Sequence, residues 1–169
     1  MSTILNTNGS ELTIPRVADP SNFKAVVLTA EWNEQVTGAL RDGALRVFSE
    51  AGIPEQNIRS YSVPGTVELV NAAARAMHTI PGLDAVVILG CVIRGDTPHF
   101  DYVCKIAADG CALLNSRGEG AVIFGVLTVE NLQQALDRAG GSLGNKGAEA
   151  AVAAIAMSNL AKEMSLNIR

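Results

Sequence analysis

The feature that most constrains the fold of this chain is an alternation of short apolar runs with helical segments. Four runs have the length and composition of β-strands, at residues 24–30, 57–63, 84–92 and 121–128. Apolar spacing and turn residues predict helices at residues 33–51, 66–79, 98–116, 130–139 and 147–164. The run at 84–92 is apolar throughout, which is typical of a central strand of a parallel sheet. We therefore predict an α/β fold: a small doubly wound, parallel four-stranded sheet of flavodoxin-like order, with helices on both faces.

The length of 169 residues is enough for one domain with its own apolar core. Residues 1–22 are polar and contain Pro15 and Pro20, so we expect an N-terminal arm there and a single domain over residues 23–169. The first residues lack the basic start and apolar core of a signal peptide. The longest apolar run, at 85–93, is far shorter than the roughly 20 residues that cross a membrane. We therefore expect a cytoplasmic protein with no membrane segment.

Charge and cysteine content argue against several classes of partner. The formal net charge of −4 disfavours nucleic acid and acidic membrane surfaces. Cys91, Cys104 and Cys111 form no C-x-x-C pair, and the chain has only two histidines, so we expect no metal site. We interpret the three thiols as inert core residues and His78 as a surface residue.

Two of the predicted helices are apolar on nearly every side. They cover residues 103–114 and the last helical segment, "GAEAAVAAIAMSNLAKEM". A sheet covers only one face of a helix, so the remaining apolar face needs another cover. We predict that a second copy of the chain supplies it and that the protein is a homo-oligomer.

The joint between the third strand and its helix reads "RGDTPH", and parallel sheets bind ligands at this edge. Thr97 is a favoured N-cap and Pro98 a favoured first helical residue, so we expect the helix to begin there. The free amides of its first turn would attract an anion such as phosphate, and Gly95 would allow close approach. His99, in the first turn, would then exchange protons near neutral pH. The alternative is a simple cap and turn, and Asp96 disfavours an anion unless its carboxylate points away.

The other strand exits carry further candidates. Trp32 follows the first strand and suits stacking on a heteroaromatic ring, and Asn33 beside it suits a ligand or a helix cap. Glu68 follows a Pro-Gly turn and suits a ligand hydroxyl or a first helical turn. Arg138 and Lys146 flank a glycine-rich link, expected to be flexible, and suit an anion pocket or solvent. The fourth exit is expected over Phe124 to Thr128.

Four segments, taken together, resemble the lumazine synthase family. They are "VPGTVELVNAAA", "LGCVIRGDTPHFDYV", "VIFGVLT" and "QALDRAGGSLGNKGAEAA", in the family's order, and the resemblance covers about residues 24 to 161. It implies condensation of 5-amino-6-(D-ribitylamino)uracil with 3,4-dihydroxy-2-butanone 4-phosphate to 6,7-dimethyl-8-ribityllumazine, a step of riboflavin biosynthesis that releases phosphate and water. It implies no metal or redox cofactor, and the sequence has no G-x-G-x-x-G motif.

The resemblance also implies a role for individual residues. It makes His99 the proton-transfer residue and Arg138 a ligand of the phosphate. The residues that it implies around the two substrates are Trp32, Asn33, Thr66, Val67, Glu68, Cys91, Val92, Ile93, Gly95, Asp96, Thr97, Phe124 and Lys146. Trp32 would stack on the pyrimidine, where the family commonly has phenylalanine, and Glu68 would bind the ribityl chain. The backbone at 91–93 would read the pyrimidine edge, and 95–97 would hold the phosphate.

The resemblance implies an assembly as well. Phe124, Arg138 and Lys146 would come from a neighbouring subunit of a pentamer or of a sixty-subunit icosahedral shell. The short link from Arg138 to Lys146 favours the shell, and riboflavin synthase is an implied partner. The alternatives are an inactive shell-forming paralogue and a flavin- or lumazine-binding protein. An FMN carrier would need a Ser/Thr-rich loop where this chain has "TAEWNEQV", and a phospho-receiver would need paired acids where it has only Glu31.

Overall fold

The protein is described here by a computed structural model, which covers residues 12–166; the first half of the expected arm, residues 1–11, lies outside this range. Its centre is a parallel sheet in the order β2-β1-β3-β4. The strands are β1 (Ala25–Ala30), β2 (Ile58–Val63), β3 (Ala85–Ile93) and β4 (Ala121–Val129). The predicted fold class and strand order are confirmed.

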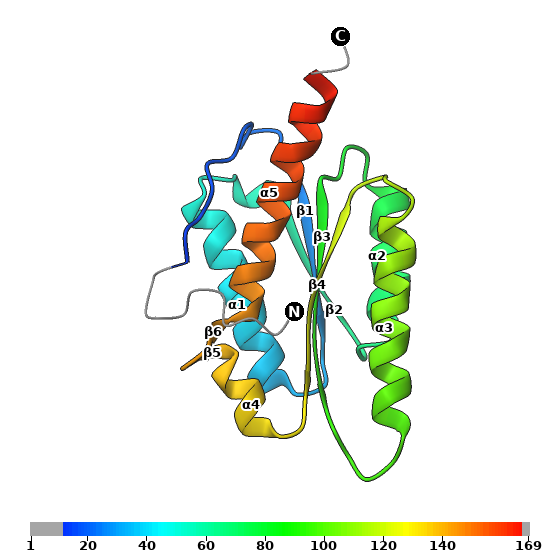
Figure 1. Ribbon diagram of the computed structural model, residues 1–169. Coiled ribbons are helices and arrows are strands. Elements are labelled where there is room, and N and C mark those ends of the chain that lie inside the picture. The colour runs from blue at the N-terminus through cyan, green and yellow to red at the C-terminus, as the bar shows by residue number, and fades with distance from the viewer. Residues whose placement is uncertain (1–11, 167–169) are drawn as a thin grey trace.

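Helices cover both faces of the sheet (Figure 1). On one face lie α1 (Glu34–Glu50), α4 (Leu132–Asp137) and α5 (Lys146–Leu166). On the other lie α2 (Glu68–Thr79) and α3 (His99–Asn115). A short 3-10 helix, η1 (Glu55–Asn57), precedes β2, and β5 (Ala139–Gly141) and β6 (Gly144–Asn145) form a small antiparallel hairpin. None of the helices within residues 12–166 is both long and apolar enough to cross a lipid bilayer.

Two apolar layers, one on each face of the sheet, hold the molecule together. The layer under α1 and α5 contains Leu40, Val47 and Ile155, and the layer under α2 and α3 contains Leu69 and Leu114. Each fully buried side chain of this size stabilises the fold by about 1.5–3 kcal/mol relative to an exposed one. The first seven residues of β3 are buried, which confirms it as the central strand.

The described part of the expected arm packs on the domain. Val17 is buried in the layer under α1 and α5. The amide of Ala18 donates to Oδ1 of Asn159, and Nδ2 of Asn159 donates to the carbonyl oxygen of Arg16, each over 2.9 Å. The described part of the arm therefore contributes Val17 to the core.

The start of α3 differs from the prediction. The helix begins at His99, Pro98 occupies the N-cap position, and Thr97 makes no capping hydrogen bond. The amide of Asp101 bonds to the carbonyl oxygen of Pro98 over 3.0 Å and closes the first turn of the helix. The amide of Arg94 pairs with the carbonyl oxygen of Val129, so the pairing with β4 extends one residue beyond β3.

The glycine-rich link is ordered, contrary to the expectation of a flexible connection. It forms the β5–β6 hairpin, in which Gly140 and Gly144 adopt φ angles of 112° and 80°. The amide of Lys146 closes the hairpin on the carbonyl oxygen of Arg138 over 2.8 Å. Asn145 ties it to α1 through a 2.9 Å bond from Nδ2 to the carbonyl oxygen of Ala39.

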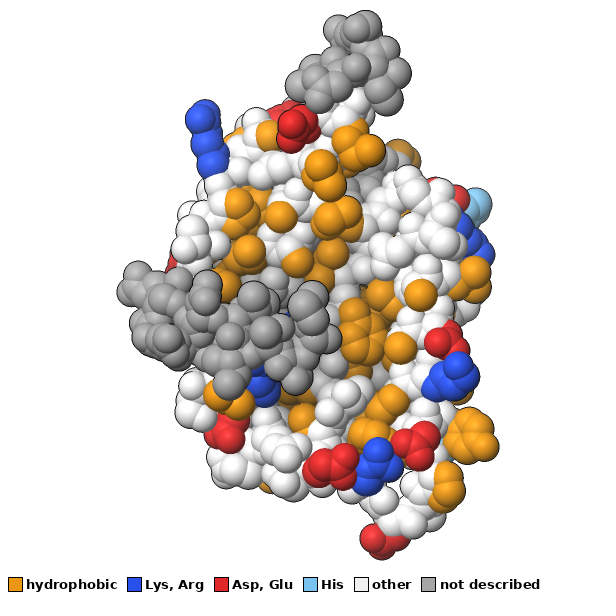
Figure 2. Space-filling view, in the orientation of Figure 1, with side chains coloured by type: hydrophobic (Ala, Val, Ile, Leu, Met, Phe, Trp, Pro, Cys, Tyr) orange, Lys and Arg blue, Asp and Glu red, His pale blue; other side chains and the backbone are white. Residues whose placement is uncertain are grey.

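The two helices that are apolar on nearly every side, α3 and α5, expose large apolar side chains in the single chain. They are Tyr102, Ile106 and Leu113 on α3 and Met157, Leu160 and Met164 on α5. Figure 2 shows hydrophobic side chains gathered over α5. Of the free thiols, Cys91 and Cys111 are buried as predicted, whereas Cys104 is partly exposed and is not a core residue. His78 is exposed, as predicted.

Candidate active site

A cavity of about 500 Å³ opens at the carboxyl edge of the sheet. It is lined by Trp32, Asn33, Gly65, Thr66, Val67, Glu68, Cys91, Val92, Ile93, His99 and Val103. Nine of these residues were singled out from the sequence, and Gly65 and Val103 are additional. Two loops, the end of β3 and the starts of α2 and α3 therefore bring most of the predicted residues to one place.

The loop after β1 presents Trp32 at the mouth of the cavity. The side chain of Trp32 is 73% exposed, which is unusual for the largest apolar side chain of the fold. Asn33, the next residue, has a φ of 60°, a left-handed conformation that asparagine tolerates better than most residues. Its side chain does not cap α1; its Nδ2 donates to the carbonyl oxygen of Cys91 over 3.0 Å. This bond fixes the loop that carries Trp32 against β3.

The turn between β2 and α2 supplies the opposite wall. Thr66 is buried, and its Oγ1 lies 2.9 Å from the point where a Cβ on Gly90 would be. A side chain at Gly90 would therefore push this wall away from β3. A Cβ on Gly65 would lie 3.0 Å from a carboxylate oxygen of Glu68 and 3.5 Å from Cδ1 of Trp32. Gly65 thus leaves the space that Glu68 and Trp32 share.

The floor of the cavity is the end of β3, and its far side is α3. Burial raises the pKa of the Cys91 thiol to about 11, so this thiol is protonated at neutral pH. His99 is exposed at the first position of α3, and Val103 lies one turn further on the same face. The four-residue spacing from His99 was a sequence signal for Val103, and the Pro-Gly turn was one for Gly65.

Six predicted residues do not line the cavity of the single chain. Gly95, Asp96 and Thr97 are exposed in the loop that leads to His99. Phe124 was expected at a strand exit, but it lies in the middle of β4 beside Ile88. The remaining two, Arg138 and Lys146, lie at the β5–β6 hairpin on the α1–α5 side.

Arg138 and Lys146 share one carboxylate there. Nη2 of Arg138 lies 3.4 Å and Nζ of Lys146 lies 3.2 Å from Oε2 of Glu149. All three side chains are less than a third exposed, so the charges are held together out of most of the solvent. Glu149 therefore holds the two cations side by side at the β5–β6 hairpin, where they could bind an anion together.

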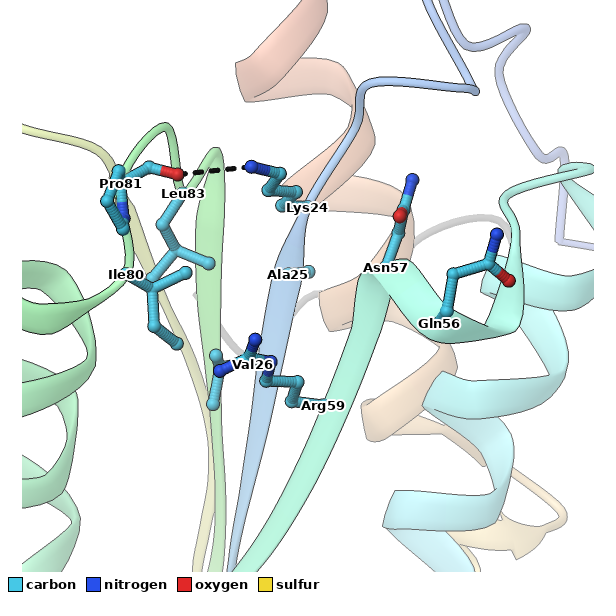
Figure 3. A pocket seen from close by; sticks show the side chains of 9 residues that line it. All are labelled: Lys24, Ala25, Val26, Gln56, Asn57, Arg59, Ile80, Pro81 and Leu83. Atoms are coloured by element: carbon cyan, nitrogen blue, oxygen red, sulfur yellow. Dashed lines mark hydrogen bonds between the residues drawn. The ribbon is translucent and has the colours of Figure 1, made fainter.

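A second cavity, of about 180 Å³, lies at the amino ends of the strands (Figure 3). The side chain of Lys24 lies across the top of this cavity, and its Nζ donates to the carbonyl oxygen of Pro81 over 3.2 Å. Arg59 lies below it. It contains none of the residues predicted from the sequence. The carboxyl-edge cavity is therefore the candidate active site.

Comparisons with known proteins show similarity to one family. Residues 22–162 match the family model described as 6,7-dimethyl-8-ribityllumazine synthase. A protein of that name from Bacteroides fragilis is 49% identical over 135 residues, covering 80% of this chain and 94% of its own length. The protein of that name from Parabacteroides distasonis is 47% identical over 152 residues, covering 90% and 94%. One from Phocaeicola vulgatus is 43% identical over 150 residues, covering 89% of each chain.

Proposed function

The chain belongs to the 6,7-dimethyl-8-ribityllumazine synthase family, and from this premise we propose how its residues carry out the reaction. The enzyme is a transferase of riboflavin biosynthesis. It condenses 5-amino-6-(D-ribitylamino)uracil with 3,4-dihydroxy-2-butanone 4-phosphate and releases phosphate and water. Two small polar molecules must therefore be held side by side, one flat and one carrying a dianion.

The pyrimidine stacks on Trp32 in this proposal, and the ribityl chain bonds to Glu68. The observation that carries it is the convergence of Trp32, Glu68 and His99 on one cavity from the loop after β1 and the starts of α2 and α3. The exposed indole offers a flat apolar surface, and the carboxylate accepts bonds from hydroxyl groups. The backbone of residues 91–93 then reads the polar edge of the ring, because backbone amides and carbonyls are fixed by β3.

The phosphate is held by the loop at residues 95–97. Within the described part of the chain, the amides of Gly95, Asp96 and Thr97 have no acceptor, and they precede a helix of 17 residues. Free amides and a positive helix end both favour an anion. His99 stands between this loop and the cavity and transfers protons during imine formation, phosphate elimination and ring closure. Holding the two reactants together supplies much of the acceleration.

A second copy of the chain completes the site in this proposal. It contributes Phe124, Arg138 and Lys146, which lie outside the cavity of the first copy. The exposed apolar residues of α3 and α5 support an interface between copies, because such faces are costly in water. We propose a homopentamer or a sixty-subunit icosahedral shell in the cytoplasm, and riboflavin synthase as a partner that takes up the product.

Tryptophan fluorescence tests the proposed site directly, because Trp32 is the only tryptophan of the chain. Titration with the ribitylaminouracil should quench the fluorescence, and the butanone phosphate alone should not. A Trp32→Phe variant should keep the lumazine-forming activity and lose the signal. Turnover by the wild-type protein without any quenching would refute stacking on Trp32. Assembly without lumazine formation from both substrates would instead identify the inactive shell-forming alternative.

A further inference from the structure

The loop proposed to hold the phosphate has few bonds of its own. Residues 94–99 are all exposed, and the amides at 95–97 have no acceptor among the described residues. Such a segment takes its shape from its two ends, which are the last residue paired to β4 and the first turn of α3. Whatever fixes the distance between these two ends therefore fixes the anion-binding amides and His99.

One side chain, Arg94, contacts both ends. Its Nε lies 3.0 Å from Oε2 of Glu130, just beyond β4, and its backbone amide donates to the carbonyl oxygen of Val129 over 2.9 Å. Its Nη2 lies 3.3 Å from Oδ1 of Asp101, and its Cζ lies 4.0 Å from the ring centre of Phe100. Phe100 and Asp101 directly follow His99, so the guanidinium joins the end of β4 to the first turn of α3.

We propose that Arg94 is a positioning residue for the phosphate substrate: it holds α3 against β4 so that residues 95–99 keep the shape that binds the phosphate. This inference rests on the proposed role of those residues. Two of the five N–H groups of Arg94 donate to carboxylates at the two ends of the loop, and in this proposal Arg94 acts on the phosphate through the loop. A planar guanidinium is required, because the N–H groups on its edge donate to two carboxylates while its face covers the ring of Phe100.

An ordinary surface ion pair would not have this effect. Exposed ion pairs contribute little to stability because solvent screens them, and the side chain of Arg94 is 39% exposed. Here, however, one side chain makes three contacts that link the end of β4 to the first turn of α3, on either side of the loop. A displacement of about 1 Å in a substrate-positioning group is enough to slow a reaction about 100-fold. The expected effect is therefore on substrate binding rather than on stability.

The test compares Arg94→Met and Arg94→Lys with the wild-type protein in steady-state kinetics. We expect Arg94→Met to raise the KM for the butanone phosphate and the Ki for inorganic phosphate together, by about 10-fold or more. The KM for the ribitylaminouracil should stay unchanged, because Trp32 lies in the loop after β1 and Glu68 at the start of α2. Arg94→Lys keeps the charge without the planar fork and should restore only part of the affinity. A matched control is Arg46→Met, which breaks the exposed Arg46–Glu50 pair on α1 and should change neither constant.

A double variant, Arg94→Met with Glu130→Gln, separates shape from charge. It removes a carboxylate along with the guanidinium, so a purely electrostatic effect would be reversed. We expect the high KM to persist in the double variant. A return to the wild-type KM, or equal increases of the KM for both substrates in Arg94→Met, would overturn the positioning role.

Inorganic phosphate also separates this inference from the proposal on which it rests. If phosphate competes with the butanone phosphate in the wild-type protein and equally well in Arg94→Met, the positioning role is wrong and the phosphate site stands. If phosphate does not compete even in the wild-type protein, the proposed phosphate site itself is wrong. Melting temperatures of all variants show whether a loss of affinity follows a loss of folded protein.

Discussion

The side-chain amide of Asn33 donates to the carbonyl oxygen of Cys91 over 3.0 Å and so joins the loop after β1 to the end of β3. Asn33 has a left-handed backbone, which favours glycine, asparagine or aspartate. One residue therefore meets two requirements: a backbone that can reverse before α1 and a donor that can reach β3. The exposed indole of Trp32 depends on both.

Replacement of Asn33 by alanine tests this dependence. Asn33→Ala loses the bond, at about 1 kcal/mol, and strains the backbone, at about 1–2 kcal/mol. Asn33→Gly loses the bond alone and should lower the free energy of unfolding by about 1 kcal/mol. Urea unfolding at a fixed protein concentration measures both. Equal losses in the two variants would mean that the left-handed backbone carries no strain.

Close packing of α5 on α1 leads to a second expectation. A Cβ on Gly147 would overlap the backbone of Leu40, whereas a Cβ on Gly38 would meet nothing closer than 3.9 Å. Gly147→Ala should therefore lower the free energy of unfolding by about 1–3 kcal/mol, as overpacking does. Gly38→Ala, in the interior of α1, should raise it by about 0.5–1 kcal/mol. A stable Gly147→Ala variant in thermal unfolding would show that α5 can shift away from α1.

The buried thiol of Cys91 makes stability depend on alkaline pH. Its pKa rises from the ordinary value of 9.0 to about 11 in the folded chain because burial disfavours the thiolate. The unfolded state therefore loses its proton first, and the stability that this thiol supplies is full below pH 9 and declines as the pH rises to 11. Cys91→Ala removes this contribution. The difference in unfolding free energy between the wild-type protein and Cys91→Ala should shrink from pH 9 to pH 11, and a constant difference would contradict the assignment.

The fold could be predicted from the sequence because its signals are local. The apolar run of β3 and the spacing of Leu40 and Val47 in α1 require no knowledge of distant residues. The rule that ligands bind at the carboxyl edge then led to Trp32, Glu68 and His99. Sheet order follows from a small set of allowed crossovers, so that strand assignment nearly determines it.

The errors arose where contacts distant in sequence decide the local structure. Cap preferences favoured Thr97, but Pro98 occupies the N-cap position, one residue later. Glycines suggested a flexible link, but Asn145 bonds to Ala39, 106 residues away, and orders the hairpin. Phe124 was named at a strand exit although the strand predicted over 121–128 already contained it, and β4 places it in the strand's interior.

His99 is expected to control the rate of the chemical steps. His99→Ala should lower kcat by roughly 10- to 1,000-fold, at or below the usual range for acid–base catalysis, because water and the pyrimidine also carry protons. The fluorescence change of Trp32 on binding of the ribitylaminouracil should persist in this variant, since the indole lies on another loop. A kcat equal to that of the wild-type protein would remove His99 from the mechanism.

Arg138 is expected to act on the phosphate of a neighbouring copy. Arg138→Ala should weaken binding of the butanone phosphate by about 1.5–3 kcal/mol, the usual range for a charged hydrogen bond, and leave binding of the ribitylaminouracil unchanged. Equal loss for both substrates would contradict this assignment. The mutation also frees Glu149, which then faces Lys146 alone, so Arg138→Lys serves as the control that keeps a cation beside it.

Mixed assemblies distinguish a shared site from one built within a single chain. In a shared site, His99 comes from one copy and Arg138 from the next, and each copy alone has the two residues in separate groups. Unfolding His99→Ala and Arg138→Ala chains together and refolding them should then create some sites with both residues intact. Such mixtures should be more active than the mean of the two variants refolded separately. Activity equal to that mean would show that both residues act within the same chain, and the exposed faces of α3 and α5 would then need another explanation.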